Sequence, residues 1–232
     1  MIVRHTLDEV QYITQPDHAR LAARVMAYCV ALQHEPRRDA ILQAIQRHDD
    51  GWQEEDEAPP IDPQSGEVLD FIHAPLPVRQ GVWPRSVEKL ERDPWAAALV
   101  AHHAVFVYSR YRDDPSWNAF FTRMEGLRDG HVDRSGLTQM TLESDYEYLR
   151  LADLISLFFC TGSSERVEFA QWTIRPSEAG VTITPDPFAG VTVPLEIEAR
   201  TLTTQRFATS TDLGAALKRA LAVTLRGTAT GG

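Results

Sequence analysis

Asp153 is the first residue of the sequence that points to chemistry. It lies in the segment LADLISLFFC, which is apolar nearly all round and predicts a helix in the middle of the core. An unpaired carboxylate in such a place is costly, and buried charges in proteins are paired or bound to metals. Asp153 therefore needs a partner from elsewhere in the chain.

Two histidines fall on helix faces that we expect to be buried. His18 shares a face with Leu21, and His48 continues the apolar stripe of Ile45. Asp49 lies about 100° round the helix from His48, so both side chains can reach one ion. They also lie in the last turn of their helix, where the negative end of the helix dipole favours a cation. Imidazole and carboxylate groups that converge on one core predict a metal site.

Two imidazoles and two carboxylates suit a divalent transition metal, namely Mn, Fe, Co, Ni or Zn, rather than calcium. Such an ion lowers the pKa of a bound water molecule and polarises a phosphoryl oxygen. Asp50, beside the predicted ligands, is a candidate general base. Each residue alone also has an ordinary interpretation, because a core histidine is usually only hydrogen-bonded and a late helical Asp is often solvated or paired with arginine.

The order of these residues, His18, then His48 with Asp49, then Asp153, resembles the H, HD, D pattern of the HD-domain superfamily. The resemblance covers about residues 14 to 160. The stretches ITQPDHARLA, HDDGW and DLISLFFC also resemble a bacterial family of HD-like proteins of unknown function. The resemblance implies a helical bundle that binds one or two divalent ions, with Asp49 in the catalytic set, and that hydrolyses phosphoesters, often in nucleotides.

HD-type proteins with two metals carry two further histidines between the HD pair and the last Asp. This chain offers the adjacent pair His102 and His103, and later His131. Neighbouring helical residues point about 100° apart, so one of the pair faces the metal. Similarity to the family's helix favours His103 as the ligand and leaves His102 to bind substrate or to pack.

Residues expected around a substrate come from several parts of the chain. His73 and Trp52 belong to the long segment 52–92, where His73 is expected to line the pocket. Trp52 and Trp83 are expected to form its walls. Arg20 is a candidate for binding an anionic substrate group.

The leading hypothesis is therefore an enzyme, a metal-dependent hydrolase of a small phosphorylated substrate, either nucleotide-like or another phosphomonoester or diester. One alternative is an HD-fold di-iron oxygenase, and another is a non-catalytic metal-binding or regulatory module. The sequence contains no G-x-S-x-G elbow, no phosphate-binding G-x-x-x-x-G-K motif and no G-x-G-x-x-G turn. Nucleophile-elbow hydrolases, P-loop enzymes and dinucleotide-binding folds are disfavoured accordingly.

The elements that must position these residues are mostly helical. Helices are expected over residues 15–33, 37–50, 93–112, 115 to between 126 and 130, and 141–160. Gly51 is expected to end the second of them in a left-handed conformation. Segment 52–92 is rich in proline and shows no sustained period, which predicts an irregular lid or pocket wall.

After Gly162 the pattern changes to period two, which predicts three or four antiparallel strands, a short helix over 211–221 and a loose tail. Residues 1–13 alternate loosely, as one or two short strands would. We therefore expect a mainly α fold, with an HD-like helical metal-binding domain over residues 1–162. Residues 163–232 are expected to form a β-rich segment with one short helix, either packed on the first domain or separate.

Composition limits the partners. With a formal net charge of −10, the protein has little to attract DNA or RNA polymers, so a small molecule is the expected partner. No stretch is long and apolar enough for a membrane span or a signal segment, which favours a cytoplasmic location. Cys29 and Cys160 lie in predicted helices and are expected to be buried thiols. A homo-oligomer is compatible with the sequence.

Overall fold

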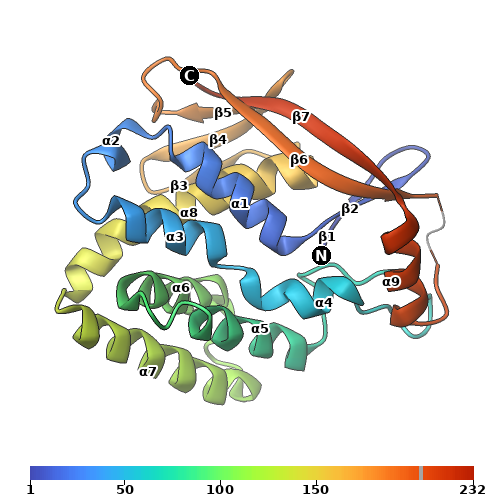
Figure 1. Ribbon diagram of the computed structural model, residues 1–232, viewed down its shortest axis with the longest axis horizontal. Helices are drawn as coiled ribbons and strands as arrows, with labels where there is room; N and C mark the ends of the chain where they lie inside the picture. The colour runs from blue at the N-terminus through green and yellow to red at the C-terminus, as the bar shows by residue number, and fades with distance from the viewer. Residues whose placement is uncertain (204–205) are drawn as a thin grey trace.

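The computed structural model of the protein describes residues 1–203 and 206–232 (Figure 1). Its helices are α1 (Gln15–Met26), α2 (Val30–Gln33), α3 (Arg38–Arg47), α4 (Gln53–Glu57), α5 (Leu76–Glu88), α6 (Pro94–Val107), α7 (Asn118–Ser135), α8 (Gln139–Thr161) and α9 (Ser210–Arg219). Its strands are β1 (Ile2–His5), β2 (Val10–Ile13), β3 (Val167–Phe169), β4 (Trp172–Ser177), β5 (Gly180–Thr184), β6 (Val193–Leu202) and β7 (Leu221–Gly231).

The expected fold class, a mainly α bundle with a small antiparallel β segment, is wrong. About 51% of the chain is helical, and all seven strands form one curled, mixed sheet in the order β1-β2-β6-β7-β5-β4-β3. β1 and β2 come from the N-terminus, yet β2 pairs with β6. β5 and β7 run parallel, whereas the other neighbours are antiparallel. The alternation of apolar residues indicates strands but does not identify their pairing partners.

The sheet covers one side of the helices (Figure 1). α1 packs on β6, and α8 packs on β1, β4 and β5, so these two helices lie directly under the sheet. α3 packs against both of them and against α6, which in turn contacts α5 and α7. The buried apolar side chains of α1, α3, α6 and α8 form one core with the inner face of the sheet. Four helices thus meet in the interior.

Capping residues fix where the helices start. Thr14 accepts a hydrogen bond from the Asp17 backbone N–H at 3.1 Å, and Asp93 accepts one from Ala96 at 3.1 Å. Both starts agree with the sequence. The helix expected over 15–33 is instead interrupted after Met26 and resumes as the short α2.

Segment 52–92 is not irregular throughout, because it contains α4 and α5. Pro77 lies in the first turn of α5, where a missing N–H costs nothing, and Pro84 lies inside the helix. Gly51 is not left-handed as expected. A Cβ on Gly51 would overlap the Val82 carbonyl oxygen, so glycine is required there because α5 approaches closely. The Gly51 N–H also donates to Ser86 Oγ at 2.8 Å, which ties α5 to the end of α3.

The tail expected to be loose is most of β7, which lies between β6 and β5 in the sheet. Small residues such as Gly227 and Ala229 give this strand little apolar alternation, so the sequence signal is weak. None of the described helices combines the length and the apolar character that crossing a membrane requires.

Candidate metal centre

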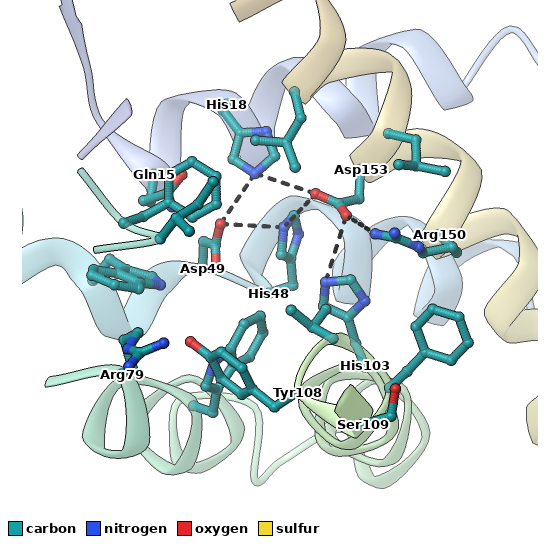
Figure 2. A pocket seen from close by; sticks show the side chains of 18 of the residues that line it. Gln15, His18, His48, Asp49, Arg79, His103, Tyr108, Ser109, Arg150 and Asp153 are labelled. Carbon is teal, nitrogen blue, oxygen red and sulfur yellow. Dashed lines mark hydrogen bonds and ion pairs between the residues drawn. The ribbon is translucent and has the colours of Figure 1, made fainter. Parts of the chain in front are cut away.

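Five polar side chains meet where α1, α3, α6 and α8 converge (Figure 2). They are His18 from α1, His48 and Asp49 from the end of α3, His103 from α6 and Asp153 from α8. None of the five is more than 4% exposed. The structure therefore brings together the residues that the sequence predicts as metal ligands.

The first group of potential ligands consists of His18, His48 and Asp49. His18 Nε2 lies 3.1 Å from Asp49 Oδ2, and His48 Nε2 lies 3.3 Å from the same oxygen. One ligand atom from each residue lies within 4.8 Å of the other two. This spacing allows all three to bind a single ion.

The second group consists of His48, His103 and Asp153, again with ligand atoms within 4.8 Å of one another. His48 Nε2 lies 3.8 Å from Asp153 Oδ1, and His103 Nε2 lies 3.8 Å from Asp153 Oδ2. His48 belongs to both groups and stands between the rings of His18 and His103, with both centroids 5.2 Å from its own.

Outer contacts fix the proton positions on two of the rings. Ser156 donates its hydroxyl hydrogen to the Asp153 carbonyl oxygen at 3.0 Å, so its oxygen accepts from His18 Nδ1 at 2.7 Å. His48 Nδ1 donates to the Ile45 carbonyl oxygen at 2.7 Å. With hydrogen on Nδ1, Nε2 is the atom of each ring that faces the carboxylates, and its lone pair can bind an ion once no proton occupies it. This is the arrangement that orients histidines in metal sites.

Two further contacts hold the other side of the cluster. Tyr146 Oη lies 3.1 Å from His103 Nδ1, and Arg150 donates to Asp153 Oδ2 at 2.7 Å. Burial raises the pKa of Tyr146 well above its usual value, so its hydroxyl stays protonated. These contacts orient both side chains.

The fit of a metal ion to this donor set can be judged from His48. Its Nε2 is buried and has no hydrogen-bond partner among the residues that the structure describes. Two carboxylates nevertheless face this atom. Buried polar atoms are nearly always satisfied, so a cation is required here, either a proton on Nε2 or a metal ion. The buried His and Asp groups could hold a metal ion.

The protonation states without metal follow from burial and from the neighbouring charges. Burial lowers the pKa of His48, but the carboxylates of Asp49 and Asp153 raise it to about 9. Burial opposes ionisation of Asp49, yet His48 and His18 hold its pKa well below the usual range. Burial lowers the pKa of His103 to about 3, so this ring is neutral. The cluster therefore balances buried carboxylates with a charged His48.

A cavity of about 440 Å³ opens onto the cluster. Trp52 and Trp83, which the sequence predicts as pocket walls, both line it. Arg79, Arg110 and Arg150 line it as well. Its size is that of a small-molecule site.

The family model for DUF3891, described as a protein of unknown function, matches residues 1–204. The chain belongs to the DUF3891 family. No curated protein and no solved structure matches it. The part that matches DUF3891 includes all five residues of the cluster and the helices that carry them, from α1 to α8.

Two of the expected functional residues of this DUF3891 protein are engaged outside the cavity. Asp50 accepts a hydrogen bond from Arg47 Nε at 2.8 Å and does not line the cavity. Arg20 is an exposed residue whose guanidinium binds Asp17 at 2.7 Å. Asp50 follows Asp49 in the sequence and was therefore expected near the cluster. The turn after α3 instead directs the Asp50 side chain toward Arg47 and away from the cavity.

Two expected histidines also lie away from the cavity lining. His73 has an exposed side chain whose Nδ1 lies 2.7 Å from Asp70 Oδ1. The ring of His102 packs edge-on against Tyr146, with centroids 4.5 Å apart, and burial lowers its pKa to about 4. Of the adjacent pair, His103 is the one that faces the cluster.

The sequence reasoning missed Ser156, Arg150 and Arg79. Ser156 and Arg150 lie three residues after and before Asp153, so they share its helix face, and that spacing was a usable signal. Arg79 lies on α5, in the proline-rich segment where no periodic pattern indicated a helix.

Proposed function

We propose that this protein is a metal-dependent hydrolase that acts on small phosphorylated molecules. The observation that carries the proposal is the convergence of three imidazoles and two carboxylates at one end of a cavity that arginines also line. Apart from the two cluster carboxylates, no acidic residue in the described part of the chain lines the cavity. Its chemistry suits an anionic substrate although the whole chain has a net charge of −10.

The cluster residues would hold the ion through His18, His48, Asp49, His103 and Asp153. A divalent transition metal bound there would lower the pKa of a water molecule and polarise a phosphoryl oxygen. Ser156 and Arg150 would keep His18 and Asp153 in their binding orientations. Such support makes the ligand positions rigid before substrate arrives.

The cavity walls would position the substrate and limit water. Trp52, Trp83 and Tyr108 line the space next to the cluster. Burial raises the pKa of Tyr108 to about 12, so its hydroxyl remains a hydrogen-bond donor at neutral pH. A neutral donor and apolar walls favour binding of an anionic oxygen in a site of low polarity.

The order of the ligands along the chain also supports hydrolysis. The pattern of His18, then His48 with Asp49, then Asp153 resembles that of HD-domain proteins, which hydrolyse phosphoesters. In this resemblance the HD pair comes from the end of one helix and the last Asp from a later one, as α3 and α8 provide here. The resemblance is one of ligand order along the chain, and it does not extend to the whole fold.

The way the two ligand groups overlap favours one ion over two. His48 Nε2 carries a single lone pair in the neutral ring, so it can bind only one ion at a time. The groups that share His48 therefore cannot both be filled completely. A single ion fits a hydrolase better than a di-iron oxygenase, which needs two.

The experiment compares two neighbouring aspartates. Purified protein is stripped with a chelator, reloaded with Mn, Fe, Co, Ni or Zn, and assayed for phosphate release from a panel of phosphomonoesters and phosphodiesters. Asp49→Asn is the test variant, because Asp49 lies between two cluster histidines. Asp50→Asn is the matched control, because its side chain pairs with Arg47 away from the cavity.

We expect metal-dependent phosphate release that Asp49→Asn abolishes and Asp50→Asn retains. Binding of two irons with an oxygen-dependent spectral change would favour the oxygenase instead. Metal binding by wild-type protein without turnover of any substrate would favour a regulatory module. Failure of every ion to bind would refute the metal centre itself.

A further inference from the structure

Arg79 is held beside the cavity by an aromatic platform. Its guanidinium carbon lies 5.5 Å from the centroid of Tyr111 and 5.4 Å from that of Trp117. These two rings stack on each other, with centroids 4.8 Å apart and planes 4° apart. A guanidinium over aromatic rings is stabilised by a cation–π interaction and loses side-chain freedom. Stacking therefore orients Arg79 and leaves most of its hydrogen-bond donors unused.

Most donors of Arg79 have no protein acceptor. One terminal nitrogen donates a long hydrogen bond to Tyr111 Oη at 3.4 Å, while the buried Nε has no partner among residues 1–203 and 206–232. Within that part of the chain, no carboxylate forms an ion pair with Arg79. A half-buried guanidinium with unused donors that lines a cavity is suited to bind an anion from solution.

The other two arginines of the cavity differ from Arg79. Arg150 already donates to Asp153 at 2.7 Å. Arg110, which also lines the cavity, is exposed, and its guanidinium lies 4.9 Å from the Tyr111 ring centroid. In Figure 2, Arg79 and Tyr108 lie across from His18 and Asp153, on the other side of the drawn pocket. Arg79 is thus the interior cation whose charge the protein leaves available.

The rest of the cavity wall is mainly apolar. Its aromatic side chains are Trp52, Phe71, Trp83, Phe106 and Tyr108. Apart from the cluster, the arginines and these aromatic rings, the polar side chains that line it in the described chain are Gln15 and Ser109. A substrate rich in hydroxyl groups would leave many of these hydroxyl groups without hydrogen-bond partners. An apolar group would instead pack favourably against these walls.

We propose that Arg79 binds the anionic group of the substrate, and that the rest of the substrate is an apolar, preferably aromatic, group packed against the cavity wall. This deepens the proposed function and rests on it. The substrate class is then a phosphate ester of an apolar or aromatic alcohol rather than of a sugar or another polyol. Arg79 sets specificity for the anion, and the aromatic wall sets specificity for the alcohol.

The test measures binding with ligands that cannot be hydrolysed. Phenylphosphonate and methylphosphonate carry the same anionic group and differ in the apolar part, and a carbon–phosphorus bond resists phosphoesterase chemistry. Each is titrated by calorimetry into Mn-loaded wild-type protein and into Arg79→Gln, Arg79→Lys and Arg38→Gln. Arg38 pairs with Asp39 on the exposed face of α3 and controls for the loss of one positive charge.

Wild-type protein should bind phenylphosphonate at least about tenfold more tightly than methylphosphonate. Arg79→Gln should weaken both by about 10- to 100-fold, because charge-assisted hydrogen bonds are lost. Arg79→Lys should recover part of the affinity, and Arg38→Gln should behave as wild type. Melting temperature and Mn affinity are measured for every variant. If Arg79→Gln does not fold, Arg79→Lys is compared with wild type instead.

Equal affinity of wild type and Arg79→Gln would overturn the role of Arg79. Equal affinity for the two phosphonates would overturn the apolar substrate class, and no binding of either to wild type would overturn both. Binding as expected, with no hydrolysis of any phosphoester, would refute the proposed hydrolase while the binding site stands. The two failures are therefore distinguishable.

Discussion

Metal affinity should rise steeply with pH, because a proton and a metal ion compete for one atom, His48 Nε2. His48 Nδ1 is committed to the Ile45 carbonyl oxygen at 2.7 Å, so the second proton of the charged ring is on Nε2. Burial lowers the pKa of His48, but Asp49 and Asp153 raise it to about 9. At pH 7 the metal-free protein therefore carries this proton, and the ion must displace it.

The size of the effect follows from that pKa. Well below a pKa of about 9, each unit of pH changes the fraction of deprotonated His48 roughly tenfold. Between about pH 6 and pH 8 the apparent association constant should therefore increase by about 100-fold, or about 2.7 kcal/mol. The increase should level off once the pH passes the pKa of His48.

The assay is calorimetric titration of Mn²⁺ into metal-free protein, in the presence of a competing chelator of known pH dependence. Repeating the titration at pH 7 in two buffers of different ionisation enthalpy gives the number of protons released. We expect about one proton from His48 for each ion bound. An affinity that does not change with pH, together with no proton release, would refute the reasoning that His48 Nε2 is the shared atom.

Other predictions follow from the contacts around the cluster. Ser156→Ala should weaken metal binding about tenfold without unfolding the protein, measured by the same titration, because it releases the ring of His18. His103→Asn should weaken metal binding at least about tenfold, while His102→Asn should change it less than about twofold, and equal effects would contradict the placement of the two rings. Gly51→Ala should lower the free energy of unfolding by more than about 2 kcal/mol in urea, because the added Cβ would overlap a carbonyl oxygen of α5.

The cluster was predictable from sequence because ionisable residues occupy helix positions where buried apolar residues are expected. Asp153 interrupts an apolar helix, and His18 and His48 lie on stripes that otherwise bury aliphatic side chains. Such conflicts between residue type and helix face are visible without a structure. The choice of His103 over His102 came from resemblance, since neighbouring helical positions cannot be ranked by spacing when the helix is buried on nearly every face, as α6 is.

The sheet and the cavity walls were less predictable, for different physical reasons. β2 finds its partner β6 almost the whole chain length away, and local alternation contains no information on such pairing. Because its segment is rich in proline, α5 was not predicted as a helix, although Pro77 lies in the first turn, where helices tolerate proline. Since α5 was not predicted, Arg79 on that helix was not identified as a candidate residue. The metal ligands could thus be inferred from sequence, whereas on the substrate side only the walls Trp52 and Trp83 were expected and Arg79 was not.

Nearby cations can compensate the two buried carboxylates of the cluster without a metal ion. Asp153 has a permanent counter-charge in Arg150 at 2.7 Å, whereas the ion-pair partners of Asp49 among the residues that the structure describes are the two histidine rings. A proton on His48 supplies the missing charge in the metal-free protein, and an ion that displaces it supplies the same kind of compensation. A metal ion that binds His48 Nε2 would therefore replace one buried cation with another. We therefore expect the ionised state of Asp49 to depend on the bound ion more strongly than that of Asp153, which keeps its ion pair with Arg150.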